Sequence, residues 1–293
     1  MAAGCAAGRP RAGDRAQPDP DRPRDHIRGD RSALGSKAKG VGEDVPYLAI
    51  DTATQTLSVA VGEQGKLLGE ATTQLSKNHS VKMMPLLEGL MSNLDLAPDT
   101  LQGIVVGRGP GSYTGVRIAV TAAKAFAMAL KIPLVGVSSL DALARHGAMS
   151  DALIVPMFDA RRKQAYTAFY EVQNGEFVKI TDDQLMVLDD LIKAINSRMV
   201  VRRLDKRPVK VLLLGDGAQA HREELRERLG EKALFAPSPS HDFVRAAHLL
   251  EAGIPLIEAG EAHDAATFAP EYLQLVEAEK KWLEAQGAGG KTE

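Results

Sequence analysis

The sequence predicts an α/β protein of two lobes, each with a mixed β-sheet and flanking helices. The first observation is a series of short alternating strands, beginning near residue 46, followed by a strand–helix–strand crossover. The second is that the same order returns in weaker form after residue 150. Hairpins give antiparallel pairs and a helical crossover gives a parallel pair, so each lobe is expected to contain a mixed sheet.

The composition is that of a folded, soluble chain. Its 293 residues are 44% hydrophobic and 25% charged, which is too apolar for general disorder. The formal net charge of -2 argues against binding nucleic acid through bulk electrostatics. The single cysteine, Cys5, excludes a disulfide framework and a thiolate metal site. Because no apolar run is long enough to span a membrane, a cytoplasmic location is expected.

Residues 1–45 differ from the rest of the chain. They contain 9 Lys or Arg, 7 Asp or Glu and 7 Gly, and show no helical or strand periodicity. We expect a disordered extension; alternatively, translation begins near Val41 or Val45. The other expected divisions are a first lobe at 46–150, a second, degenerate lobe at 151–266, and a C-terminal helix and tail at 267–293.

The first lobe is expected to begin with an antiparallel meander and to continue with a crossover. Leu57, Val59 and Val61 alternate with small or polar residues, as in a half-buried strand. The expected elements are strands at 47–51, 56–62 and 66–74, a helix at 80–95, a strand from 103, a helix from 114 or 115 to 131, a strand at 134–137 and a helix from 138 or 139 to 145.

Two of these helices carry the candidate residues for contact with a partner protein. The helix at 80–95 has an apolar face wider than one sheet normally needs, and Pro85 is expected to kink it or delay its start. It is interpreted either as a core helix or as a helix whose far edge is an interface. The helix at 114–131 is rich in alanine and has a polar stripe. The candidate partner-binding residues are Met83, Leu87, Leu90, Met91, Arg117, Thr121 and Lys124.

A glycine-rich loop at 107–115 joins a strand to a helix. Backbone N–H groups at such a helix start can hold an anion. The spacing fits neither a Walker loop, a dinucleotide fingerprint nor a nucleophile elbow, and Pro110 removes one N–H donor. From the residues alone, the loop is either a tight structural turn or a ligand loop. Asp51, at the end of the first strand, likewise either binds a metal-bound phosphate or caps its hairpin.

The second lobe is expected to repeat the hairpins and the crossover helix. The expected elements are strands at 152–158, 164–172 and 177–187, a helix at 189–197, a strand at 209–214 that ends in a turn at 215–217, a charged helix from there through 229, a helix at 241–252 and a final helix from 270. A basic run is interpreted either as a solvated loop or as an RNA contact. Its members are Arg202, Arg203, Lys206, Arg207 and Lys210.

The sequence pattern lacks the residues that metal-dependent or nucleophilic catalysis needs. None of the 7 histidines forms a His-x-x-x-His pair, and no carboxylate spacing completes a metal triad. His79 is interpreted as a helix-start or core histidine. Ser112 has no base nearby in the sequence. We therefore expect neither a catalytic residue nor a metal ligand in this chain.

Several segments resemble the bacterial TsaB (YeaZ) family, and their order along the chain agrees as well. They are Leu48–Thr54, Asn78–Ser80 with Met84–Pro85, Val106–Arg117, Gly136–Leu140 and Asp159–Arg162. The resemblance covers roughly residues 46–275. It implies the actin/Hsp70/sugar-kinase (ASKHA) architecture, a two-lobed fold in which each lobe is a mixed β-sheet with flanking helices.

The resemblance also implies a function. Members of the family work in the cytoplasmic machinery that forms N6-threonylcarbamoyladenosine at position 37 of tRNAs reading codons that begin with A. The implied role is a non-catalytic scaffold that binds and activates its paralogue TsaD, or pairs with itself as a homodimer. TsaE is the implied accessory ATPase, and tRNA is contacted only indirectly. ATP and metal are implied for TsaD and TsaE, and no cofactor for this chain.

The hairpin at 51–56 and the Asp216–Gly217 turn resemble the phosphate-binding hairpins of this architecture but lack most of their glycines. The degenerate nucleotide-binding residues expected on this basis are Asp51, Thr52, Thr54, Gly109, Gly111 and Ser112. One alternative to the scaffold is an ATP-dependent phosphotransferase that uses Asp51 and the loop at 107–115. Another is an independent metallopeptidase, which the missing histidine ligands disfavour.

Overall fold

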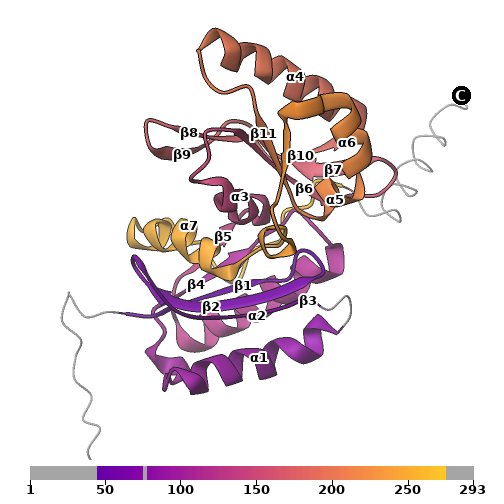
Figure 1. The fold of residues 1–293 in the computed structure, drawn as a ribbon. Coiled ribbons are helices and arrows are strands. Elements are labelled where there is room, and N and C mark those ends of the chain that lie inside the picture. The colour runs from indigo at the N-terminus through magenta and orange to yellow at the C-terminus, as the bar shows by residue number, and fades with distance from the viewer. Residues whose placement is uncertain (1–44, 75–77, 275–293) are drawn as a thin grey trace, which may run out of the picture. The chain divides into compact units, whose positions relative to one another are not determined.

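The computed structural model describes residues 45–74 and 78–274. The predicted N-terminal extension therefore lies outside the described residues, except for Val45, and so does the predicted tail after residue 274. The described helices and strands fall within one unit, residues 44–293, and are arranged around two β-sheets (Figure 1). Among the described residues, no helix is both long and apolar enough to cross a lipid bilayer.

The first sheet has five strands in the order β3-β2-β1-β4-β5. β1 pairs antiparallel with β2, and β2 with β3, whereas β1, β4 and β5 run parallel. Leu57, Val59 and Val61 are fully buried, but so are Ser58 and Ala60 between them, because helices cover both faces of the sheet. The strand bounds are β1 Tyr47–Asp51, β2 Thr56–Glu63, β3 Lys66–Gln74, β4 Gly103–Gly107 and β5 Leu134–Val137.

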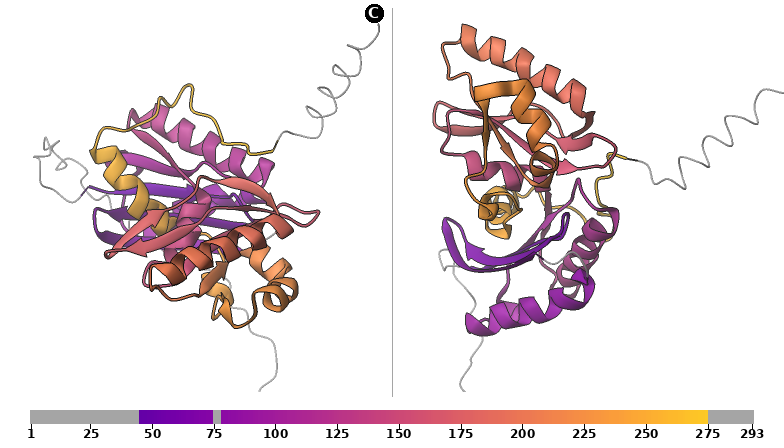
Figure 2. Two further views of the ribbon diagram at one scale, coloured as in Figure 1. Left: turned by 90° about the horizontal axis from the view of Figure 1, so that it is seen from above. Right: turned by 45° about the vertical axis from the view of Figure 1, so that its right-hand side comes forward.

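Helices cover both faces of this sheet (Figure 2). α1 (His79–Asn93) packs against β2 and β3, and α2 (Tyr113–Leu130) packs against β4 and β1 on the same face. On the opposite face, α7 (Ala246–Glu258) contacts β1, β2, β4 and β5, with α3 (Ser139–Ala144) beside it. Pro85 lies inside α1, so it neither ends the helix nor delays its start.

The second sheet has seven strands and repeats the plan of the first. Apart from β7 and β10, its order is β9-β8-β6-β11-β12, with antiparallel pairs on one side of β6 and parallel pairs on the other. The predicted α/β class with two mixed sheets is therefore confirmed. The strand bounds are β6 Leu153–Asp159, β7 Gln164–Thr167, β8 Tyr170–Gln173, β9 Glu176–Lys179, β10 Gln184–Val187, β11 Val211–Leu214 and β12 Ala233–Phe235.

The two sheets share a hydrophobic core. Val105 of the first sheet and Ile154 of the second belong to one cluster, together with Leu143 of α3 and Ile254 of α7. α7 packs on the first sheet, α3 packs on β6 of the second, and the two helices contact each other, so together they fill the space between the sheets. On the far face of the second sheet, a separate cluster includes residues from α4 (Leu188–Leu204), α5 (Asp216–Ala220) and α6 (Arg222–Leu229).

Several predicted elements have different bounds in the structure. The strand expected at 177–187 is two strands, β9 and β10, and the strand expected at 164–172 is β7 and β8. The helix expected at 241–252 begins at Ala246, and it packs on the first sheet although it lies within the range assigned to the second lobe. No helix is present at 270–274, because the Glu271 N–H donates instead to Arg108 O at 2.8 Å, away from its own segment.

Part of the predicted basic run is internal. Arg202 is 1% exposed and lies 3.0 Å from Oε1 of Glu171, which is also 1% exposed. Arg198 and Arg207 contact the same carboxylate. Burial alone would raise the pKa of Glu171, but the surrounding guanidinium groups hold it below its usual value. Two charges of the basic run, those of Arg202 and Arg207, therefore balance a buried carboxylate and do not form a free basic surface.

The histidine rings between α3 and α7 make the fold sensitive to acid. His146 lies 4.6 Å from His248 and 5.8 Å from His241, measured between ring centroids, and donates to Phe243 O at 3.0 Å. Burial, assisted by His248, lowers the pKa of His146 to about 4. The unfolded chain, with an ordinary histidine pKa of about 6.5, takes up this proton first as the pH falls. Stability is therefore lost below that pH and down to the folded-state value.

We predict that His146→Gln removes most of this loss, because an amide can keep the hydrogen bond to Phe243 O without titrating. The His146 contribution to the wild-type free energy of unfolding should fall by about 2 kcal/mol between pH 7.5 and pH 5. Urea unfolding at the two pH values measures it, with His79→Gln as a control outside the cluster. The same acid loss in His146→Gln as in the wild type would contradict this account.

Candidate functional site

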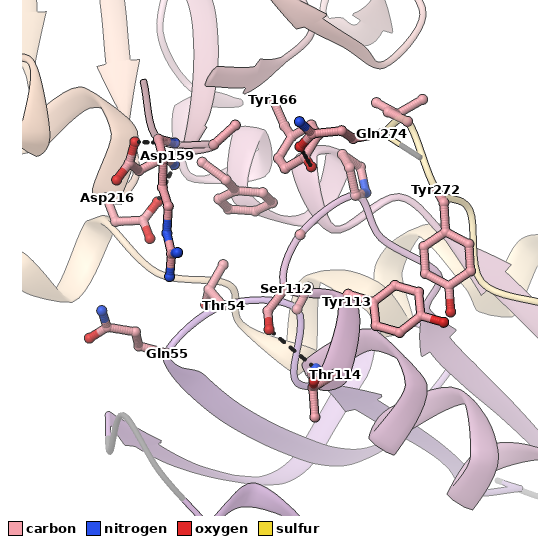
Figure 3. A pocket seen from close by; sticks show the side chains of 18 of the residues that line it. Thr54, Gln55, Ser112, Tyr113, Thr114, Asp159, Tyr166, Asp216, Tyr272 and Gln274 are labelled. Atoms are coloured by element: carbon pink, nitrogen blue, oxygen red, sulfur yellow. Dashed lines mark hydrogen bonds between the residues drawn. The ribbon is translucent and has the colours of Figure 1, made fainter. Parts of the chain in front are cut away.

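The candidate site is a cleft of about 990 Å³ lined by residues of both sheets (Figure 3). One wall comes from the first sheet: the β1–β2 hairpin, the start of α1 and the start of α2. The other comes from the end of β6, the following hairpin and the start of α5. Residues 271–274, which follow α7, complete the lining. Connections after the carboxyl ends of parallel strands commonly bind ligands, and this cleft lies beyond such ends of β1, β4 and β6.

Asp51 lies behind the cleft and does not line it. Its carboxylate is fully buried and accepts the N–H of Ala53 at 2.9 Å and the Ser139 Oγ–H at 2.6 Å. Burial raises the pKa of Asp51 to about 6, although both hydrogen bonds act to lower it. A Cβ at Gly107 would lie 1.9 Å from Asp51 Oδ2, so the carboxylate is enclosed on that side too. Asp51 therefore fits the hairpin-cap interpretation.

The glycine-rich loop packs directly on the β1–β2 hairpin. The Ser112 N–H donates to Ala53 O at 2.6 Å, and Thr52 Oγ1 donates to Gly115 O at 2.6 Å. A Cβ at Gly111 would lie 2.2 Å from Ala53 O, and one at Gly115 would lie 2.1 Å from Thr52 O. Such distances are far below van der Waals contact, so only glycine fits. This packing fits the interpretation of the loop as a tight structural turn, one of the two alternatives that the sequence left open.

The expected nucleotide-binding residues divide into two groups. Thr54, Gly111 and Ser112 line the cleft. Asp51, Thr52 and Gly109 do not; the first two are fully buried behind it, and a Cβ at Gly109 would lie 2.9 Å from Glu271 O. A phosphate held between hairpin and loop needs exposed N–H groups on both, but these two segments are bonded to each other.

The wall from the second sheet carries two carboxylates and a basic hairpin. The Asp159 N–H donates to Asp216 Oδ1 at 3.1 Å, and the Arg161 N–H donates to Asp159 Oδ1 at 2.9 Å. Burial of the Asp216 carboxyl group, with the charge of Asp159 nearby, raises its pKa. Residues 161–163 all have positive φ values, of 64°, 50° and 57°, which is uncommon for side chains larger than glycine. The turn thus presents consecutive basic residues at the cleft.

The third part of the lining is aromatic and was missed by the sequence analysis. Tyr113, at the start of α2, stacks on Tyr272 with ring centroids 4.8 Å apart and an interplanar angle of 29°. Arg117 donates to the Tyr113 hydroxyl oxygen at 2.6 Å. The Tyr166 hydroxyl lies 3.1 Å from Gln274 Oε1 and donates to it. The residues are far apart in sequence, so only the fold brings them together.

The described residues contain no group of three or more His, Cys, Asp or Glu side chains placed to hold a metal ion. His79 lines the cleft at the start of α1, where its Nε2 lies 3.2 Å from Thr54 O. This position fits the interpretation of His79 as a helix-start histidine. The alternative of an independent metallopeptidase gains no ligand set from the part of the chain that the structure covers.

Comparison with known proteins gives consistent matches. The sequence profile of a family described as "TsaD: tRNA N6-adenosine threonylcarbamoyltransferase" matches residues 67–282. The "tRNA threonylcarbamoyladenosine biosynthesis protein TsaB" of Bacillus subtilis is 41% identical over 239 residues, covering 82% of this chain and 98% of that protein. The chain belongs to the TsaB (YeaZ) family.

Two solved structures share the fold of this chain. Two from Pseudomonas aeruginosa, described as "YeaZ" and as an uncharacterized protein "with similarity to peptidase YEAZ", are each 24% identical and cover 78% of this chain and 100% of their own. Their TM-scores are 0.61 and 0.64, respectively. With the repeated strand order of the two sheets, they confirm the predicted α/β architecture of two mixed sheets with flanking helices.

The structure shows where the candidate partner-binding side chains lie. Met83, Leu87, Leu90 and Met91 are buried in the core between α1, α2 and the first sheet, with exposed fractions of 8% or less, so they are not available at the surface of this chain. Lys124 is also engaged within the chain, since Nζ donates to Phe268 O at 2.7 Å and to Ala266 O at 3.2 Å. Arg117 and Thr121 are exposed. Because the structure holds a single chain, the interface itself stays a prediction.

We predict that Asp51→Asn stabilises the protein at neutral pH. The folded-state pKa of Asp51 lies above the usual value for aspartate, so its contribution to stability is greatest below the unfolded-state pKa and is lost as the pH rises through about 6. An asparagine can still accept the Ala53 N–H and contact Ser139. The free energy of unfolding should rise by up to about 3 kcal/mol at pH 7.5 and change little at pH 4.

Chemical denaturation at both pH values measures this, with Asp95→Asn as a matched exposed control. A loss of stability at pH 7.5 that exceeds the loss at pH 4 would show that the ionised carboxylate is stabilised, and would reverse the assignment of Asp51 as a structural cap.

Proposed function

We propose that the protein is a non-catalytic scaffold that binds and activates TsaD, in the complex that forms N6-threonylcarbamoyladenosine at position 37 of tRNAs reading codons that begin with A. Support for the pathway comes from the Bacillus subtilis relative, which is named for this biosynthesis and aligns over almost its whole length. Support for a non-catalytic role comes mainly from one observation: the hairpin and the glycine-rich loop are hydrogen-bonded to each other, with Asp51 enclosed behind them.

This packing argues against the alternative function, an ATP-dependent phosphotransferase. Transfer of a phosphoryl group needs backbone N–H groups and a metal-binding carboxylate directed at the phosphates. The Ser112 N–H is already bonded to Ala53 O, and both carboxylate oxygens of Asp51 are bonded inside the fold. In the proposed complex, ATP and metal are therefore held by TsaD and TsaE, and all subunits meet in the cytoplasm.

We predict that the isolated protein shows no micromolar binding of ATP with Mg²⁺. Isothermal titration calorimetry with the full-length protein measures this directly. Binding in the micromolar range that Gly111→Ala weakens would favour the phosphotransferase over the scaffold.

The surface proposed for contact with TsaD is the exposed face of α1 and α2, on the side of the first sheet away from the second (Figure 2). Val81, Met84 and Met128 are 71%, 47% and 59% exposed, so these two neighbouring helices present large apolar side chains to solvent. Gly89 and Ala125 on the same helices are small and exposed, so they allow a partner helix to approach closely. A standard interface of about 1,600 Å² would cover both helices.

We predict that Met84→Asp and Met128→Asp each weaken binding of the TsaD homologue by roughly thirtyfold or more, because each places a charge in an apolar interface. Surface plasmon resonance measures the affinity. Both side chains are exposed in the free chain, so the melting temperature should stay close to that of the wild type. Met149→Asp is the matched control, since Met149 is fully exposed elsewhere.

The same variants test the function in cells depleted of the native protein. Mass spectrometry of tRNA nucleosides should show loss of N6-threonylcarbamoyladenosine, restored by the wild type and by Met149→Asp but not by the two interface variants. Unchanged levels of the modified nucleoside after depletion would refute the proposed function.

A further inference from the structure

The stacked tyrosines at the cleft have no role in the core of the protein. Tyr113 and Tyr272 are each 42% exposed, and both line the cleft. Figure 3 shows them side by side at one end of it. The Arg117 guanidinium lies 5.2 Å from the Tyr113 ring centroid. Two stacked aromatic rings with an arginine beside them, open to solvent, are the chemistry that proteins use to stack unpaired nucleobases.

The chain holds this aromatic pair in a fixed position. Phe268, four residues before Tyr272, is buried in the hydrophobic cluster formed by α1, α2 and the first sheet. Lys124 of α2 donates to two backbone carbonyls of the same segment. Glu271 is held twice, by its N–H to Arg108 O at 2.8 Å and by its carboxylate 3.0 Å from Arg108 Nε. A ligand that stacks here therefore meets a preorganised surface and does not have to order a loop.

One cation on the opposite wall is left without a partner in the described residues. Arg161 is exposed and lines the cleft; its backbone N–H is bonded to Asp159, but its guanidinium has no hydrogen bond or ion pair there. By contrast, Arg108 is paired with Glu271, and Lys163 is paired with Glu224. The Arg161 side chain can thus contact a phosphate without first breaking an ion pair.

The remaining polar lining is mainly neutral. Thr54, Gln55, Gln164 and Gln274 supply hydroxyl and amide groups that can donate to and accept from base edges. Figure 3 shows Asp159 and Asp216 at the other end of the cleft from the tyrosines. These two carboxylates repel a polyphosphate far more strongly than a phosphodiester. A polyphosphate carries several negative charges, whereas a phosphodiester carries one per nucleotide. The electrostatics therefore favour an RNA strand over a nucleoside triphosphate.

We propose that this cleft binds a single-stranded segment of RNA, with one base stacked on the Tyr113–Tyr272 pair and an adjacent phosphate contacted by Arg161. The inference rests on the proposed function for the source of the RNA, a tRNA. It differs from the sequence-based expectation that tRNA is contacted only indirectly. The basic run around Arg202 does not line this cleft, and two of its members, Arg202 and Arg207, are paired with Glu171.

The test is fluorescence anisotropy with a 5′-labelled anticodon stem-loop RNA. The full-length protein is measured alone and in complex with the TsaD homologue, over a series of salt concentrations. Tyr272→Ala should weaken RNA binding by about tenfold, within the range for loss of one base-stacking contact. Tyr272→Phe keeps the ring and should keep the affinity. Because the second variant retains the packing of this segment, the pair separates stacking from folding.

Arg161→Glu tests the phosphate contact independently of the tyrosines. It should weaken binding and reduce the dependence of log affinity on log salt by about one unit, as expected for loss of one phosphate contact. Arg203→Glu is the matched control, because Arg203 is exposed on α4. The RNA affinity and salt dependence of this variant should equal those of the wild type.

Three results would overturn the inference: no RNA binding by the chain or the complex, equal affinity in Tyr272→Ala, Arg161→Glu and the wild type, or displacement of RNA by micromolar ATP. Loss of TsaD affinity in Tyr272→Ala with unchanged RNA affinity would identify the cleft as a protein contact and overturn it too. If the variants weaken RNA binding as expected but depletion leaves the modified nucleoside unchanged, the proposed function fails and this inference stands.

Discussion

The contact between the β1–β2 hairpin and the glycine-rich loop is the constraint on which the site depends. At Gly111 and Gly115 the loop touches the backbone of the hairpin with no side chain between them, and the bonds of Ala53 O and Thr52 Oγ1 close the contact. This contact fixes where α2 begins and places the Ser112 cap there. It also engages the Ser112 N–H, a donor that a phosphate bound between the hairpin and the loop would need. The feature that forms the floor of the cleft therefore supports the interpretation of this hairpin as a degenerate nucleotide-binding hairpin.

The segment after α7 is the second element that shapes the cleft. It is attached to the first sheet by the bond from the His263 N–H to Leu134 O and by Phe268, whose ring fills the space above Gly136. It then reaches β7 of the second sheet through Gln274 and Tyr166. α3 and α7 already join the two sheets in one core. The segment after α7 adds a second connection between them, at the open edge of the cleft. The aromatic wall is thus held by both sheets.

Much of the fold could be predicted from local patterns. Alternating residues and glycine turns identified the meander, and the order of elements identified the repeat in the second half. What could not be predicted depends on residues distant in sequence. The apolar side chains of α1 indicated a broad face, but only the packing of α2 beside α1 shows that Met83 and Leu87 are enclosed. Likewise, the burial of Arg202 follows from Glu171 on β8, which no local pattern connects to it.

The same limit applies to the site. The glycine-rich motif and the Asp159–Arg162 segment both stand out in the sequence, because strand ends and turns have local signatures, and residues of both line the cleft. Of the two, only the glycine-rich motif was predicted to be part of a site. The stacking of Tyr113 on Tyr272 joins residues that are far apart in the sequence. The sequence also could not distinguish Asp51 as a cap from Asp51 as a ligand, because both uses place a carboxylate after a strand. The difference lies in Ser139 and Gly107, which enclose it.

α2 connects the two proposed surfaces. Its 18 residues span about 27 Å, with Tyr113 in the cleft at one end and Met128 exposed near the other. Arg117 lies one turn from Tyr113 and bonds to it, so it belongs with the cleft more than with the partner face. Sites separated by more than about 10 Å normally contribute additively. If partner binding at Met128 changed the affinity of the cleft for RNA, a displacement of the whole helix would be the simplest cause, and the bonds between Gly115 and Thr52 would have to move with it.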